Sequence, residues 1–270
     1  MRRDPPRVSG QAPGEMLKEY SADLHIHTCL SPCASLDLSP LKIIERARTK
    51  RLDIIAITDH NTAKNVQVVM RLGEAGGLKV IPGMEVQTRE EIHLLALFPD
   101  GGSVALWDEE VYRHLPDVKN NPDVFGDQPI VDPEGNILQF EERLLINSLD
   151  LSLEEVKRRV EGHGGLIIPS HFDKGSYSLI SQLGLIPPHL ELEGLEMSRR
   201  MEGRQLGTFH DPSPSIPRII SSDAHSLEDI GTAYTGFLMT EPTLEELRLA
   251  LRGQGGRRIT RRVDGGAAIL

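Results

Sequence analysis

Short apolar runs that alternate with helix-like segments constrain the fold of this chain more than any other feature. Residues 52–58 (LDIIAIT) are almost entirely apolar, as expected for a parallel strand that is covered on both faces. Before this run, Ser39 and Pro40 form a helix start, and the helix is expected to continue to about residue 50. This strand and helix order predicts an α/β fold.

The same alternation continues along the chain. We expect helices at residues 63–75, 152–161 and 243–251, the last two opened by Ser152 with Glu155 and by Thr243 with Glu246. Expected strands cover residues 78–81, 92–98, 166–171, 192–196, 218–225 and 234–239, and the last of these ends the sheet. Residues 1–19 are expected to be a lead-in with a short helix near residues 15–19. Residues 100–150 contain the turn-rich stretches NNP and DPEGN and are expected to be an insertion or cap.

Composition limits the class of protein. The 270 residues include 39% hydrophobic side chains, enough for one large α/β domain or two small ones. No apolar run approaches the roughly 20 residues of a membrane helix, no secretory leader is visible, and two cysteines form no disulfide framework, so a cytoplasmic protein is expected. A net charge of -10 makes an extended nucleic-acid surface unexpected, and the arginines at 257, 258, 261 and 262 are interpreted as a solvated tail. The oligomeric state is left open.

A His-x-His pair within residues 23–27 (DLHIH) is the first candidate for metal chemistry. Strand alternation would place Asp23, His25 and His27 on one face, with Cα atoms of the two histidines on the order of 6–7 Å apart. Both rings could then reach one ion at roughly 2.0–2.1 Å. The alternative is a pair of interior or surface histidines without a metal.

Further histidines and acids follow the expected strands and favour the metal interpretation. Since carboxyl ends of parallel strands converge, we expect one site that contains these residues: His25, His27, His60, Glu85, His93, His171, Asp223 and His225. His93 begins its strand, so it reaches the site only if the chain makes a hairpin between Glu85 and Glu91. Histidines and carboxylates without a zinc-ribbon cysteine pattern indicate a multinuclear hydrolytic site.

Five motifs in order, DLHIHT, ITDHN, GME, PSH and SDAH, resemble the PHP (polymerase and histidinol phosphatase) superfamily over roughly residues 21–240. The resemblance implies a distorted (β/α)7 TIM-like barrel of PHP type, with the insertion at about residues 100–150. A lead-in at residues 1–20 would precede the barrel, and a C-terminal helix and basic tail at residues 241–270 would follow it. It also implies two or three divalent metal ions (Zn, Mn or Fe) and hydrolysis of phosphoesters.

Matching motif by motif, the resemblance implies three metal positions. One would be held by His25, His27, Glu85 and Asp223; Glu85 would bridge to a second, held also by His93 and His171; His60 and His225 would belong to a third. The family often completes the third position with an acid or histidine after the His-x-His. Here Asp37 is our preferred candidate, and Cys33 or a water molecule are the alternatives, although either cysteine could simply be a small buried hydrophobe.

Several other residues are candidates for supporting roles. Asp23 and Asp59 are expected to orient the ligands from behind rather than to bind metal. Lys174, Arg199 and Arg200 are candidates for gripping a phosphate, with surface charge as the alternative. Glu196, at the end of an expected strand, is interpreted either as a site residue or as a structural one.

The predicted function is hydrolysis of a phosphomonoester or phosphodiester by metal-activated water, with no side-chain nucleophile. Paired metals would clamp the attacking and leaving oxygens, and the substrate would be a phosphorylated small molecule, a nucleotide or a short oligonucleotide. The alternatives are a metal-dependent amidohydrolase, which usually needs a carboxylated lysine at a strand end, and a regulatory module with a vestigial metal site. The segment at residues 100–150 is expected to select between monoester and diester by covering the mouth.

Overall fold

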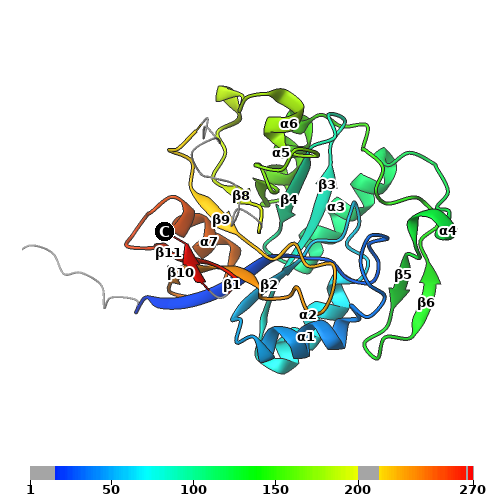
Figure 1. Cartoon of the computed structure of the whole chain (residues 1–270), viewed down its shortest axis with the longest axis horizontal. Helices are drawn as coiled ribbons and strands as arrows, with labels where there is room; N and C mark the ends of the chain where they lie inside the picture. Colours follow the sequence, from blue (N-terminus) through cyan, green and yellow to red (C-terminus); the bar gives the residue numbers. More distant parts are fainter. Residues whose placement is uncertain (1–15, 200–212, 266, 270) are drawn as a thin grey trace, which may run out of the picture.

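A computed structural model describes residues 16–199, 213–265 and 267–269, and its centre is one eight-stranded curled sheet (Figure 1). In spatial order the sheet contains β12 (Ala267–Ile269), β11 (Arg258–Asp264), β10 (Ala233–Met239), β1 (Lys18–Ile26), β2 (Ile54–Ile57), β3 (Lys79–Gln87), β4 (His93–Leu97) and β7 (Leu166–Pro169). Two short sheets accompany it: β5 (Pro129–Val131) with β6 (Ile137–Phe140), and β8 (Leu195–Met197) with β9 (Arg218–Ile220). The α/β class is confirmed.

The strands do not follow the predicted (β/α)7 repeat throughout. β1, β2 and β3 are parallel neighbours, but β4 runs antiparallel to both β3 and β7, and β10 runs antiparallel to β1. The reversal at β4 is the hairpin that His93 requires, since β3 and β4 pair with Gln87 opposite His93. Backbone hydrogen bonds join the β8–β9 segment to the strands on either side of it. After β7, Phe172 N donates to Glu196 O (2.8 Å), and after β1, His27 N donates to Ala224 O (3.1 Å).

Helices cover the sheet at α1 (Pro40–Thr49), α2 (Val66–Gly76), α3 (Gly101–His114), α5 (Leu153–Gly162), α6 (Leu179–Leu183) and α7 (Leu244–Leu251). The remaining helical turns are α4 (Pro122–Phe125) and η1 (Pro188–Leu190). The predicted N-cap box is present at α5, where Ser152 and Glu155 cap each other, and Gly77 ends α2 in the left-handed conformation.

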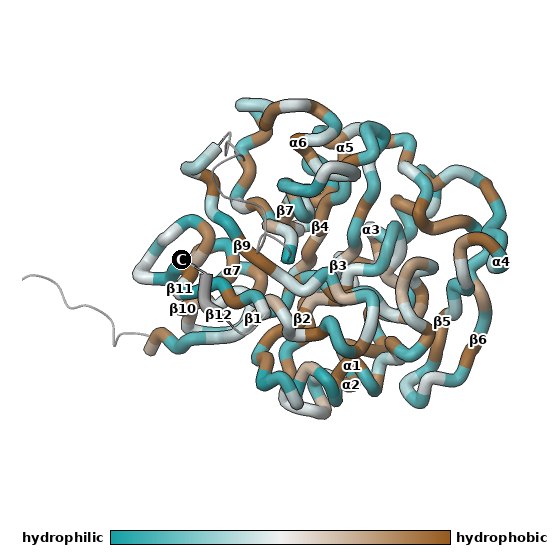
Figure 2. The backbone as a smooth tube through the Cα atoms, in the orientation of Figure 1, coloured by the Kyte–Doolittle hydropathy of each residue, from teal (hydrophilic) through white to brown (hydrophobic). Residues whose placement is uncertain are grey.

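Hydrophobic side chains pack on both faces of the strands, and the tube in Figure 2 is brown along much of the central sheet. In β2, Ile55 and Ile57 pack with α1 and α2, whereas Ile54 and Ala56 pack in a second cluster with α7 residues such as Leu247. The continuous apolar run at residues 52–58 is therefore explained as predicted, by burial on both faces.

Two predictions about the chain ends are wrong where the structure describes them. Lys18 and Glu19 lie in β1 and pair with β10 rather than forming a helix, and residues 1–15 lie outside the described residues. The basic segment is not a solvated tail, because residues 258–264 form β11 along the other edge of β10. The sequence does not predict this arginine-rich strand, because its hydrophobic and polar residues alternate only weakly. It forms because its backbone pairs with the open edge of β10.

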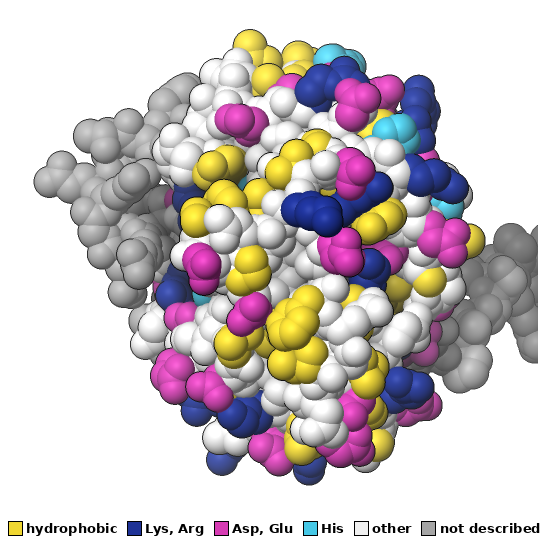
Figure 3. Space-filling view, turned by 90° about the vertical axis from the view of Figure 1, so that its right-hand side faces the viewer, with side chains coloured by type: hydrophobic (Ala, Val, Ile, Leu, Met, Phe, Trp, Pro, Cys, Tyr) yellow, Lys and Arg dark blue, Asp and Glu magenta, His cyan; other side chains and the backbone are white. Residues whose placement is uncertain are grey.

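The segment at residues 100–150 divides into two parts. Asp100 caps α3 by accepting from Ser103 N (2.8 Å), and Val104, Trp107 and Val111 of this helix are buried in the main core. This part is therefore not a peripheral insertion; its apolar spacing of three and four residues belongs to a core helix. The rest, with α4 and β5–β6, forms the face shown in Figure 3, where hydrophobic side chains gather. Its role as a cap stays a prediction.

Membrane insertion through a helix finds no support in the described residues, since none of their helices combines the length and apolarity needed to cross a bilayer.

Candidate metal centre

All eight residues proposed as metal ligands from the sequence lie in one cluster at one end of the sheet. His25 and His27 come from the end of β1, Glu85 from β3, His93 from β4, and the others from loops that follow β2, β7 and β9. Five of the six histidine residues and Glu85 are at least nine-tenths buried: His25, His27, His60, His93, His171 and Glu85. Such a concentration of polar side chains in the interior requires partners for every nitrogen and oxygen.

The first group of ligand atoms joins His25, His27, Glu85 and Asp223. His25 Nε2 lies 3.2 Å from His27 Nε2, 3.3 Å from Glu85 Oε2 and 3.3 Å from Asp223 Oδ1. His27 Nε2 lies 3.4 Å from Glu85 Oε2 and 3.6 Å from Asp223 Oδ1. Ligands at roughly 2.0–2.1 Å from a tetrahedral ion are about 3.3–3.4 Å apart, so these separations suit a single cation.

The second group surrounds the other oxygen of Glu85. Glu85 Oε1 lies 3.2 Å from His93 Nδ1 and 3.5 Å from His171 Nε2. His60 Nδ1 lies 3.3 Å from Glu85 Oε2, so this ring stands between the two groups. The Glu85 carboxylate thus presents one oxygen to each group, which is the arrangement a bridging ligand needs.

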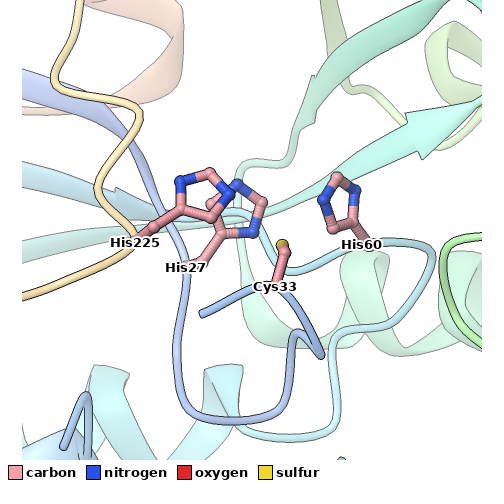
Figure 4. Close-up of side chains that lie close together, drawn as sticks. All are labelled: His27, Cys33, His60 and His225. Atoms are coloured by element: carbon pink, nitrogen blue, oxygen red, sulfur yellow. The ribbon is translucent and has the colours of Figure 1, made fainter. Parts of the chain in front are cut away.

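A third group contains His27, Cys33, His60 and His225, whose nearest ligand atoms all lie within 4.8 Å of one another (Figure 4). The preferred candidate for completing this group, Asp37, is instead on the surface. Its Oδ1 accepts from Lys42 Nζ at 2.7 Å, and its side chain is 69% exposed. The prediction that Asp37 rather than Cys33 faces the site is therefore wrong, because the loop turns Cys33, and not Asp37, towards the histidines.

Hydrogen bonds fix which nitrogen of His25 and His27 faces the site. His25 Nδ1–H donates to Glu196 Oε2 at 2.9 Å, which leaves the lone pair on Nε2. Ser31 Oγ–H donates to Asp59 Oδ1 at 2.7 Å, so the serine oxygen accepts from His27 Nδ1–H at 3.0 Å. In the neutral rings both Nε2 atoms are therefore acceptors that face the carboxylates, as metal binding requires.

Two further rings are held in the same way. Gln87 Nε2 donates to Ser148 Oγ at 2.8 Å, so Gln87 Oε1 accepts from His93 Nε2–H at 3.1 Å and leaves His93 Nδ1 facing Glu85. His225 Nδ1–H donates to the Asp223 carbonyl at 2.8 Å.

Three residues that orient the histidine rings, Gln87, Ser31 and Glu196, differ in how well the sequence predicts their roles. Gln87 lies two residues after Glu85 on the same strand, so period-two spacing was the available signal for its role. Ser31 has no comparable sequence signal, since the chain must fold back to bring it to the histidines. Glu196, left between a site role and a structural one, contacts His25 directly.

Asp23 and Asp59 both accept hydrogen bonds from residues next to the candidate metal ligands. Asp59 binds the Thr28 and Ser31 hydroxyls, as expected for an orienting residue. The pairing of β1 with β2 shifts register between Asp23 and Ile26, within the stretch for which the sequence predicts regular alternation. The Asp23 carboxylate accepts from Ser222 N and Gly231 N, both at 2.9 Å, and thereby holds the loop that carries Asp223. Burial raises the pKa of Asp23 to about 6.

Charge at the centre is strongly coupled. Burial by itself lowers the pKa of His25, but the carboxylates of Glu196, Glu85 and Asp223 outweigh it and hold that pKa well above its usual value. Burial likewise raises the pKa of Glu85, and the surrounding histidines reverse this to well below the usual value. Desolvation lowers the pKa of His225 to about 4. The carboxylates thus favour positive charge beside them, either on the histidine rings or on a bound cation.

Buried atoms without hydrogen-bond partners test whether a cation fits. Among the described residues, His60 Nδ1, Glu85 Oε1 and His93 Nδ1 are buried and accept no hydrogen bond, and these three residues form one of the candidate ligand groups. An unsatisfied buried acceptor costs roughly 1–3 kcal/mol, so three together would be strongly unfavourable without a cation. The donor set of imidazoles and carboxylates fits divalent transition metals.

A cavity of about 600 Å³ opens beside the third group. Its lining includes Lys174, Ser198, Arg199, Asp223 and His225. Lys174 Nζ donates to Asp223 Oδ2 at 2.6 Å, and Arg199 pairs with Asp229. Two of the three predicted phosphate-binding residues thus face the cavity, while Arg200 lies outside the described residues.

Comparison with known proteins identifies the sequence family of this region. Residues 23–147 match the family model of the PHP domain, and residues 214–254 match that of a PHP-associated region. The uncharacterized protein YqxK of Bacillus subtilis is 22% identical over 272 residues, which cover 90% of this chain and 64% of YqxK. A phosphoribosyl 1,2-cyclic phosphate 1,2-diphosphodiesterase of Eggerthella lenta is 28% identical over 89 residues, which cover 31% of this chain and 33% of that enzyme.

Solved structures share the fold at low identity. The lesion-specific endonuclease Q of Pyrococcus furiosus superimposes with a TM-score of 0.67 and 23% identity, covering 92% of this chain and 59% of that one. Endonuclease Q in complex with a 27-mer duplex that carries an abasic lesion at the active site gives a TM-score of 0.64 at 23% identity, covering 92% of this chain and 60% of that one. The chain thus spans less than two thirds of YqxK and of both endonuclease Q structures.

Proposed function

Because residues 23–147 of this chain match the PHP domain family model, we propose that the protein is a metal-dependent phosphoesterase. One observation carries the proposal. Four ligand atoms, from His25, His27, Glu85 and Asp223, converge to 3.2–3.6 Å, and hydrogen bonds on the far side of both rings direct the two Nε2 atoms towards the carboxylates. Only bound cations balance such a set without protonating it.

We assign the ligands in two buried positions that share Glu85. His25, His27 and Asp223 would hold one ion with Glu85 Oε2, and His93 and His171 would hold the other with Glu85 Oε1. His60 and His225 would belong to a third position. When bound, Zn, Mn or Fe would act as a Lewis acid that neutralises the substrate phosphate and activates water. The net charge of -10 is then compatible with an anionic substrate.

The chain's own residues would orient and bind. Glu196 and Ser31 hold the His25 and His27 rings, which keeps the ligand atoms in place before substrate arrives. Lys174 and Arg199 border the cavity and would contact phosphate oxygens, since both side chains line the same cavity as Asp223 and His225. No side chain is assigned as a nucleophile.

A nucleic-acid strand is the second candidate substrate, in place of a small phosphorylated metabolite. It is favoured by the similarity in fold to endonuclease Q over 92% of this chain. The expectation that no extended nucleic-acid surface exists therefore stays untested.

Hydrolysis assays separate these possibilities. Purified, metal-loaded protein should cleave p-nitrophenyl phosphate or its bis ester, and should contain two or three transition-metal ions per chain by elemental analysis. Chelation should abolish the activity and metal should restore it. Cleavage of an amide panel instead would support an amidohydrolase, and metal-free protein with full phosphoesterase activity would overturn the proposal. A duplex with an abasic site, compared with an intact duplex, tests the nucleic-acid candidate.

A further inference from the structure

The two cysteines of this chain lie four residues apart and face opposite environments. Cys29 is 2% exposed, and its Sγ accepts from Asn65 Nδ2 at 3.9 Å within the core. Cys33 lies in the loop that folds back over the site, where Ser35 N donates to His225 O at 2.8 Å. This backbone contact brings the loop to His225 and places the Cys33 thiol among three imidazoles (Figure 4).

Not all four members of this group are free to bind the same ion. His27 Nδ1 is held by Ser31, and His27 Nε2 faces His25, Glu85 and Asp223, so His27 is committed to the buried position. Cys33, His60 and His225 remain. His225 Nδ1–H is bonded to the Asp223 carbonyl, which leaves its Nε2 lone pair. His60 is 6% exposed and belongs to both this group and the one with Glu85 and His93, because its Nδ1 lies 3.3 Å from Glu85 Oε2 without a hydrogen bond among the described residues; its ring therefore borders the outer position from the inner side.

We propose that Cys33, as a thiolate, joins His60 and His225 in holding the third metal ion, and that this position selects Zn²⁺ over Mn²⁺. The inference rests on the proposed function and names the ligand that completes its third position. Thiolate is a soft ligand that favours zinc, whereas the positions that share the Glu85 carboxylate also suit manganese. Three protein ligands leave a fourth place open, as in catalytic rather than structural zinc sites. His225 lines the 600 Å³ cavity, so that place is near the substrate.

Cobalt substitution tests the thiolate directly. Chelated protein reloaded with Co²⁺ should show a near-ultraviolet thiolate-to-cobalt charge-transfer absorption. Cys33→Ser should lose this absorption and about one ion per chain. Cys29→Ser is the matched control and should keep both, as should Asp37→Ala. Cys33→Asp should regain the ion without the absorption, and in competition its third ion should be Mn²⁺ more often than in the wild type.

Thiol labelling of the wild type supplies a second measurement if the Cys33 variants fail to fold. A thiol reagent should modify Cys33 slowly in zinc-loaded protein and quickly after chelation, with the site read by mass spectrometry. The proposal is overturned if the absorption persists in Cys33→Ser, if Cys29→Ser removes it, or if zinc gives no protection. Phosphoesterase activity with no thiolate absorption would refute this inference and leave the proposed function intact. Thiolate absorption without any phosphoesterase activity would support this inference and refute the proposed function.

Discussion

The inner and outer parts of the metal centre are built differently. The inner part contains His25, His27, Glu85, His93, His171 and Asp223; all of these but Asp223 are buried, and three of them lie within strands. The outer part, Cys33, His60 and His225, comes from loops, and the His225 side chain is 35% exposed. The His25, His27 and His93 rings are held by side chains, whereas His225 is held by a backbone carbonyl two residues away.

The contrast separates two properties of one site: how firmly the metal ions are held, and how easily a substrate reaches them. Strand-borne ligands with fixed rings cannot move without disturbing the sheet, so the inner ions should be held firmly. Loop-borne ligands beside the cavity can adjust when a substrate enters. His171 and Asp223 adopt left-handed backbone conformations, φ 31° and 50°, at the transition between the sheet and these loops, where such strain is commonly functional.

The largest effect should come from Glu85, which would serve both inner positions. Glu85→Gln keeps the shape but removes the charge that two ions share, so hydrolysis of bis(p-nitrophenyl) phosphate should fall by more than about 100-fold, beyond what loss of a supporting residue causes. Elemental analysis should show the loss of inner metal. His225→Ala should lose one ion, and its activity should fall less than that of Glu85→Gln. Equal losses in the two folded variants would mean that the inner and outer parts do not differ as argued.

Glu196 should have the next largest effect, because it contacts His25 without reaching the ion positions. Glu196→Ala frees the His25 ring and should lower metal affinity or activity about 10- to 100-fold. Glu196→Gln is the control: its carbonyl can accept from His25 Nδ1–H, and its amide would take the place of Glu196 Oε1, which has no hydrogen-bond partner among the described atoms. A Gln variant as impaired as the Ala variant would point to charge rather than ring orientation.

The smallest effect should come from Gly126, which supports the outer loop from α4. At φ 96°, a Cβ here would lie 2.6 Å from the Pro32 carbonyl oxygen, beside Cys33. Gly126→Ala should therefore cost roughly 1–3 kcal/mol of unfolding free energy and weaken only the outer ion. Gly135→Ala is the control, because φ is 86° but the nearest atom, Ser39 Cβ, is 3.4 Å away. Urea unfolding and zinc titration measure both; an unchanged outer ion in Gly126→Ala would contradict the coupling.

Local sequence determined much of the fold and the choice of ligand residues. Apolar runs predicted β2, β4 and β7, capping residues predicted α5 and α7, and histidines and acids after the strands indicated one polar cluster. These inferences succeed because burial on both faces, helix capping and the convergence of strand ends depend on near neighbours or on a general rule of α/β folds. The hairpin that brings His93 to Glu85 also follows from its short connection.

Tertiary structure alone decided which side chains complete and support the site. Cys33 faces the histidines and Asp37 faces Lys42 because a backbone bond from Ser35 to His225 turns the loop, and the partners are far apart in sequence. Trp107 and the Arg258–Asp264 strand join the core and the sheet for the same reason, since long-range surfaces select them. Ser31 became recognisable only from its hydrogen bond to His27, and the hydrogen bond to His25 decided between the two interpretations of Glu196. Pattern along a chain specifies which elements form, but contacts between distant elements set the direction of each side chain.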